Sequence, residues 1–112
     1  MTSIPQPLVI KEAIGDMIKL SDVPLDGATA QILPYRLDEF EGVLFYVQVV
    51  LDGVPVAARF EGITPYSRTI EINVPRAELL NHVGPKGVEF SYRLNIGGNQ
   101  VVAPNTKYEI TH

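Results

Sequence analysis

The residues of this chain that could act as nucleophiles are few and scattered. The serines are Ser3, Ser21, Ser67 and Ser91, and none lies in a Gly-x-Ser-x-Gly sequence, the turn that exposes the catalytic serine of many hydrolases. Nucleophilic catalysis also needs a base and an orienting acid beside the nucleophile. A pair of carboxylates facing each other across a cleft stays open as an alternative, although a small sandwich offers little concavity for it. We therefore expect no catalytic residues and no enzymatic activity.

Metal-ligating residue types gather in one polar loop, residues 36–42. Asp38, Glu39 and Glu41 lie there, and calcium takes several oxygen ligands from a loop of this kind. The Asp-x-Asp-x-Asp-Gly spacing of a calcium loop is missing, and the chain has only two histidines and no cysteine for zinc. We expect a solvated acidic loop, no metal site and no bound cofactor.

Four side chains are the candidates for binding a partner: Tyr46, Arg59, Tyr66 and Arg68. The loop 62–68 offers an aromatic ring, a hydroxyl and a guanidinium, which are residue types that loops use for recognition. Each feature also has a purely structural explanation. Tyr46 would simply stack on Arg59 across two strands, and the loop would be a plain connection stiffened by proline.

An outward row of apolar residues accompanies Tyr46. It consists of Leu44, Tyr46, Val50, Pro55 and Ala57. Contiguous exposed apolar side chains usually mark a contact with a partner or a neighbouring domain, whereas isolated ones are common on any surface. The row is therefore either an interface or a face covered by a loop.

The elements that position these residues are strands, since apolar and polar residues alternate along much of the chain. The alternation is clearest over residues 88–96, and Gly97-Gly98 after it suits a type I′ turn, in which both central residues have positive φ. That turn pairs Ile96 with Asn99 and Leu94 with Val101.

Asp52-Gly53 predicts a second hairpin. Folding the chain about this turn pairs Leu51 with Val54, Val47 with Ala58 and Phe45 with Phe60, and it places Arg59 opposite Tyr46. One face of the hairpin is then entirely apolar, which specifies the register.

The whole pattern predicts an all-β, antiparallel sandwich of seven or eight strands, with a closed barrel as the alternative. Proline and glycine bracket a short helical turn near residues 75–82. We expect strands near residues 8–11, 17–20, 28–34, 43–51, 54–61, 67–74, 87–96 and 99–110. The predicted core comprises Ile32, Phe45, Val47, Val49, Ile70, Ile72, Val88, Phe90, Tyr92, Leu94 and Val101.

The length and charge of the chain restrict the number of domains and the classes of partner. The 112 residues suit one domain, 1–112, with residues 1–7 as a loose lead-in. Nine basic against 13 acidic residues, net charge -4, argue against nucleic acid or an anionic membrane as partner.

Neither a secretory leader nor a membrane-spanning apolar run is visible. The expected location is the cell surface or outside the cell for an excised domain, and the cytoplasm for a complete chain. The oligomeric state stays open.

Several segments resemble the bacterial immunoglobulin-like repeat domain, the tandem module of large repeat proteins in pseudomonads and their relatives. They are Ile14-Gly15-Asp16, Ile32-Leu33-Pro34-Tyr35, Val74-Pro75 before a helical turn, and the stretch from Gly87 to Tyr92. Where such domains usually carry tryptophan on the central strand, this chain has Phe45. The resemblance implies an immunoglobulin-like Greek-key fold and a non-catalytic spacer or adhesive module that contacts neighbouring domains or a protein partner. The alternative is a domain that binds carbohydrate or protein through loop 62–68 and the face of the hairpin 44–61.

Overall fold

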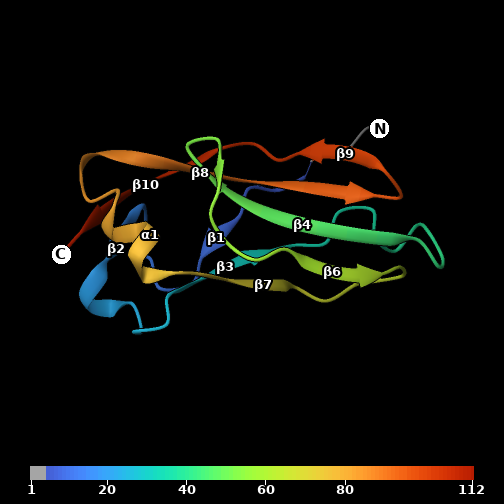
Figure 1. Cartoon of the computed structure of the whole chain (residues 1–112), viewed down its shortest axis with the longest axis horizontal. Coiled ribbons are helices and arrows are strands. Elements are labelled where there is room, and N and C mark those ends of the chain that lie inside the picture. The colour runs from blue at the N-terminus through green and yellow to red at the C-terminus, as the bar shows by residue number, and fades with distance from the viewer. Residues whose placement is uncertain (1–4) are drawn as a thin grey trace.

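The computed structural model describes residues 5–112 and is built almost entirely of strands. One short helix, α1, covers Arg76–Leu80, and a 3-10 turn, η1, covers Leu20–Asp22 (Figure 1). The strands are β1 Val9–Ile10, β2 Met17–Lys19, β3 Ala28–Ile32, β4 Leu44–Leu51, β5 Val54–Pro55, β6 Phe60–Ile63, β7 Ile70–Val74, β8 Gly84–Ile96, β9 Asn99–Val102 and β10 Thr106–Thr111. The prediction of an all-β chain with one helical turn is confirmed.

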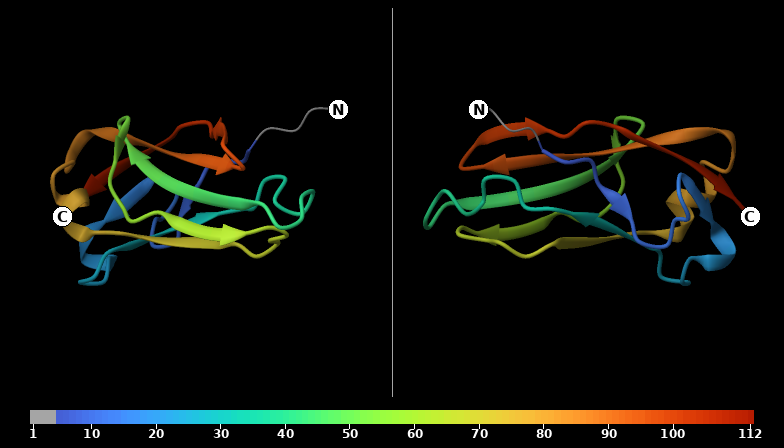
Figure 2. Two further views of the ribbon diagram at one scale, coloured as in Figure 1. Left: turned by 45° about the vertical axis from the view of Figure 1, so that its right-hand side comes forward. Right: turned by 180° about the vertical axis from the view of Figure 1, so that it is seen from behind.

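The strands form two open sheets that lie in separate layers (Figure 2). The smaller sheet has the order β1-β3-β7 and is antiparallel. The larger has the order β2-β10-β8-β4-β5, with β6 also paired to β4 and β9 to β8. β2 runs parallel to β10, and every other pairing in this sheet is antiparallel. Since no pairing among the described residues joins the two sheets, the barrel alternative is wrong.

Both sheets contribute side chains to one hydrophobic core. The longer strands place alternate side chains in this core, as β7 does with the buried Ile70, Ile72 and Val74. The ring of Phe90 meets that of Tyr108 edge to face, with centroids 5.4 Å apart. Ten of the eleven predicted core residues are buried. The exception, Val101, is partly buried because β9 pairs with β8 alone and so forms a sheet edge.

The hairpin about Gly97-Gly98 has the predicted register. Ile96 lies opposite Asn99 and Leu94 opposite Val101. The φ angles of Gly97 and Gly98 are +57° and +91°, so both glycines use the left-handed region that the turn requires.

The hairpin about Asp52-Gly53 begins as predicted and then departs from the prediction. Leu51 pairs with Val54 and Val50 with Pro55, but Val47 pairs with Phe60, two residues further along than expected. Residues 56–59 lie outside both β5 and β6, although the Val56 N–H still donates to the Val49 carbonyl at 3.2 Å, so the single predicted strand 54–61 is wrong. The Gln48 side chain replaces part of the missing main-chain pairing, because its Nε2 donates to the Ala57 carbonyl at 2.6 Å.

Other predicted bounds also change. The strand predicted over 99–110 is two strands, because Ala103 and Pro104 break the ladder and proline has no N–H to donate. β3 ends at Ile32, β7 begins only at Ile70, and β8 begins earlier than predicted, at Gly84. The predicted strand 17–20 ends at Lys19, where η1 begins.

Part of the predicted loose lead-in is tied to the sheet. Residues 1–4 of that lead-in lie outside the described residues. Pro5 is buried, and the Tyr92 hydroxyl donates to the Gln6 carbonyl at 2.7 Å. Further along, the main-chain N–H of Ile10 donates to the Tyr108 hydroxyl at 3.1 Å. Residues 5–7 are therefore not loose, because buried tyrosines of the larger sheet hold this stretch in place.

Candidate binding surface

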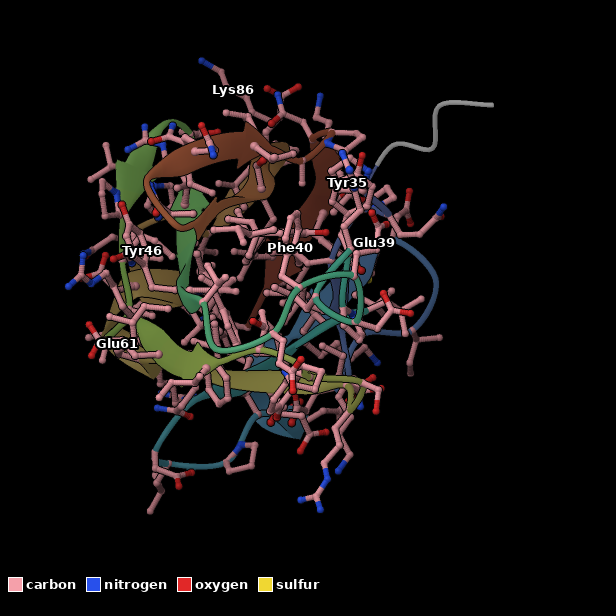
Figure 3. The ribbon with its side chains drawn as sticks, turned by 90° about the vertical axis from the view of Figure 1, so that its right-hand side faces the viewer. Tyr35, Glu39, Phe40, Tyr46, Glu61 and Lys86 are labelled. Atoms are coloured by element: carbon pink, nitrogen blue, oxygen red, sulfur yellow. The ribbon has the colours of Figure 1, made fainter. Side chains whose placement is uncertain are left out.

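Three charged or aromatic side chains meet on the outer face of the larger sheet. Tyr46 on β4 lies directly opposite Glu61 on β6. The guanidinium carbon of Arg59 lies 4.3 Å from the centroid of the Tyr46 ring, and Arg59 Nη2 lies 2.9 Å from Glu61 Oε2. The predicted stacking of Tyr46 on Arg59 is thus present, although the residue opposite Tyr46 is Glu61. Figure 3 shows Tyr46 and Glu61 on the same side of the molecule.

The Arg59–Glu61 ion pair is exposed to solvent. The side chains retain 48% and 63% of their accessible surface. Exposed pairs of this kind contribute about 0–1 kcal/mol, and the stack on Tyr46 adds about 0.5–1 kcal/mol. The cluster therefore orients the Arg59 guanidinium more than it stabilises the fold.

Tyr66 lies in a different environment from Tyr46. Its ring centroid lies 5.5 Å from that of Phe45 and 5.6 Å from that of Phe60, and the ring is partly buried against the core. Its main-chain N–H donates to the Leu37 carbonyl at 3.0 Å. Tyr66 is thus part of an aromatic cluster that attaches loop 62–68 to the sheet.

Arg68 stands apart from the other predicted binding residues. It is exposed, and it forms no ion pair with a carboxylate between residues 5 and 112. The structure therefore brings together Tyr46 and Arg59 but adds neither Tyr66 nor Arg68 to them.

A surface groove of about 610 Å³ runs beside Tyr46 at one end of the larger sheet. Its walls come from β4, β6 and the turn after β8. The lining residues are Leu44, Phe45, Tyr46, Glu61, Gly62, Ile63, Asn95, Gly97 and Gly98. Leu44 and Ile63 lie opposite each other in the ladder and are 69% and 59% exposed. These two make the groove an apolar surface open to solvent.

The absence of a side chain at Gly62 leaves room for the Phe45 ring at the base of the groove. A Cβ at Gly62 would lie 2.7 Å from Cζ of Phe45, closer than any carbon contact tolerates. The Phe45 ring therefore packs directly against the backbone of β6. The opposite wall is held by the turn, where Gly98 N–H donates to Asn95 Oδ1 at 3.0 Å and Gly97 N–H to the Leu44 carbonyl at 2.9 Å.

Sequence reasoning named Leu44 and Tyr46, assigned Ile63 to the candidate loop 62–68, and missed Asn95. Ile63 instead ends β6, because the two-residue slip in the hairpin places it opposite Leu44 where the predicted register has Glu61. The predicted outward row is also interrupted. Val50 is only 4% exposed, and it lies opposite Ser91, which is only 7% exposed. Ser91 Oγ donates to the Ala103 carbonyl at 2.8 Å, at the break between β9 and β10.

The acidic loop lies away from this surface, on the other side of the end view in Figure 3, where Glu39 is labelled. Arg36 Nε lies 3.1 Å from Glu39 Oε1, and this hydrogen bond and the carboxylate charge raise the pKa of Arg36. Among residues 5–112 no three acidic or histidine side chains gather closely enough to hold a metal ion. His82 Nδ1 lies 2.8 Å from the Glu78 carbonyl, within α1 and the turn after it.

No protein-family model, curated protein or solved structure matches this chain. Over residues 5–112, no helix has the length and apolar character needed to cross a membrane. The function therefore has to be argued from the surface itself.

Proposed function

We propose that this chain is a non-catalytic structural and interaction module, a spacer or adhesive repeat of a larger bacterial surface or secreted protein. The proposed fold is an immunoglobulin-like Greek-key sandwich. The strand orders β1-β3-β7 and β2-β10-β8-β4-β5 support it, and so does the passage from β7 to β8 through α1, which carries the chain from one sheet to the other.

The observation that carries the spacer role is the path of the chain. The molecule measures 43 × 29 × 22 Å. The segment leading into β1 enters from the half of the long axis that holds β9, whereas β10 runs toward the C-terminus at the opposite end (Figures 1 and 2). Modules joined in series through such ends would extend along their long axes, as a spacer requires.

The test of the spacer role is the coding sequence on either side of this chain. Further copies of the same strand pattern, joined by short linkers, are the expected result. A gene that encodes this domain alone, with no neighbour in the same chain, would contradict the spacer role.

A second candidate function is ligand binding, with carbohydrate or protein recognised through loop 62–68 and the face of the hairpin 44–61. The apolar groove favours it, because ligand sites are commonly concave and lined mostly by apolar side chains. Arg59 and Glu61 would supply the polar rim of such an interface.

This candidate is tested by titrating isotope-labelled protein with glycans and extended peptides and following amide chemical shifts. Ile63→Asp should abolish any response in the groove, because it places a charge beside Leu44. Arg68→Ala is the matched control, since Arg68 lies on the loop but does not line the groove. Equal loss in both variants would assign binding to the loop, and unchanged binding in Ile63→Asp would exclude the groove.

A further inference from the structure

A row of four polar side chains crosses the outer face of the larger sheet from β6 to β9. Glu61 on β6 lies opposite Tyr46 on β4, and both are on the outside of the molecule (Figure 3). Tyr46 also lies opposite Asn95 on β8, and Asn95 lies opposite Gln100 on β9. Residues paired in this way share one face of a sheet. Because neighbouring strands lie about 4.8 Å apart, the row is about 14 Å long, which suits a ligand of several linked units.

Each side chain of this row has a polar group that bonds to nothing else between residues 5 and 112. The Tyr46 hydroxyl and the Gln100 amide form no hydrogen bond there. Asn95 Oδ1 accepts a main-chain N–H of the following turn, and its Nδ2 is left without a partner. Glu61 binds Arg59 through Oε2, which leaves Oε1 available. The row therefore presents both donors and acceptors to a ligand.

The apolar groove lies along the first three members of this row, from β6 to β8. The other side of the groove is a second row, formed by Ile63, Leu44 and Gly97. Its volume of about 610 Å³ falls within the range that is usual for ligand sites. A ligand in the groove would therefore contact polar groups along one side and aliphatic side chains along the other.

The charges of the groove favour an uncharged ligand. Glu61 is the one acidic or basic side chain among the described residues that line it. Arg59 Nη2, 2.9 Å from Glu61 Oε2, already neutralises that carboxylate. A charged ligand would lose part of its hydration here without meeting an unpaired opposite charge, which is unfavourable.

The floor of the groove disfavours an extended peptide and suits a sugar chain. β4 is paired with β6 on one side and with β8 on the other, so its main-chain groups are already used. Extended peptides bind to sheets mainly through main-chain hydrogen bonds at an edge. Sugar hydroxyls both donate and accept, so they can pair with every side chain of the polar row. The C–H faces of the sugar rings would rest on Leu44 and Ile63.

We propose that the row Glu61, Tyr46, Asn95 and Gln100, together with the groove beside it, is a binding site for an uncharged oligosaccharide that lies across β6, β4, β8 and β9. The proposal rests on the second candidate function and names its ligand, and it extends the site to β8 and β9. It is independent of the spacer role.

Nuclear magnetic resonance titration of the isotope-labelled chain tests the proposal. The probes are the uncharged hexasaccharides cellohexaose, maltohexaose and chitohexaose, the acidic hexagalacturonate, and an extended peptide, each up to millimolar concentration. We expect at least one uncharged hexasaccharide to shift the side-chain amide signals of Asn95 and Gln100, and hexagalacturonate to bind more weakly than that probe.

Two variants remove single polar groups of the row. Tyr46→Phe removes the hydroxyl and keeps the ring that stacks on Arg59, and Gln100→Ala removes the amide of β9. Each should weaken hexasaccharide binding about two- to tenfold. Asn99→Ala is the matched control, because Asn99 is also on β9 but lies opposite the buried Ile96, on the other face. It should leave binding unchanged, and thermal unfolding of each variant verifies that the fold survives.

The outcomes separate this proposal from the function on which it rests. Peptide binding in the groove without binding of any uncharged hexasaccharide would overturn the sugar site and leave the second candidate function standing. Absence of binding by every probe would overturn both. Hexasaccharide binding that is unchanged in both Tyr46→Phe and Gln100→Ala, or that is weakened equally by Asn99→Ala, would show that the row is not the site.

Discussion

The hydroxyl of Tyr92 on β8 donates a hydrogen bond of 2.7 Å to the main-chain carbonyl of Gln6, which comes 86 residues earlier in the chain. Only 1% of Tyr92 is exposed, and burial raises the pKa of its phenol to about 12 from an ordinary value of 10. The phenol therefore has to stay protonated for the lead-in to remain attached.

The Tyr92 phenol should make stability depend on pH at the alkaline end. Because the folded pKa lies above the unfolded one, its contribution is complete below pH 10 and is lost as the pH rises from 10 to about 12. Over this range the free energy of unfolding falls by up to about 1.4 kcal/mol per pH unit. Urea unfolding of the natural chain and Tyr92→Phe at several pH values measures it.

Tyr92→Phe should be less stable by about 1 kcal/mol at neutral pH, because Gln6 loses its donor. Above pH 10 that difference should shrink and then reverse, since phenylalanine has no proton to lose. Parallel pH profiles for the two proteins would contradict the role of the phenol.

Gly62→Ala should lower the free energy of unfolding by about 1–3 kcal/mol, because the new methyl group would overlap the Phe45 ring. Urea denaturation measures the loss. The double variant Gly62→Ala with Phe45→Leu is the control, because a smaller side chain leaves room for the methyl. If the two changes were additive, the contact between Gly62 and Phe45 would not be the cause.

Replacing Gly97 and Gly98 with valine should destabilise the chain, because branched side chains are strained at positive φ. A substitution at Gly98 tests the backbone strain alone, because a Cβ there would meet no atom within 4 Å. We expect Gly98→Val to cost about 1–3 kcal/mol in thermal unfolding, and Gly98→Asn to cost much less because asparagine tolerates this region. Equal melting temperatures for the two variants would be inconsistent with the turn.

Ser91→Ala should lower the free energy of unfolding by about 1–2 kcal/mol, although Ser91 lies on the face that alternation assigns to solvent. Its Oγ donates to the Ala103 carbonyl, and removal leaves that acceptor without its side-chain donor in a buried position. Urea unfolding measures the change, with Ser67→Ala on the exposed loop as control. A cost no larger than that of Ser67→Ala would mean that water replaces the hydroxyl.

Much of the strand architecture follows from local patterns. Alternation over residues 88–96 identifies the buried face of β8, because side chains of a strand point to opposite faces in turn. The pair Gly97-Gly98 identifies its own turn and register, because positive φ at two successive residues is available to few other sequences.

The candidate surface depends on contacts that no local pattern contains. The pairing of Leu44 with Ile63 arises from a two-residue slip at residues 56–59, where the side chain of Gln48 replaces part of the ladder. The buried Ser91 hydroxyl donates to the carbonyl of Ala103, twelve positions away, at a break in the ladder. Tyr66 joins Phe45 and Phe60 because loop 62–68 folds back onto the sheet. The sequence alone determined which residues favour strands and tight turns, since those preferences arise within a few residues. Tertiary structure decided which outward side chains stay exposed, since that depends on which distant segment covers each face.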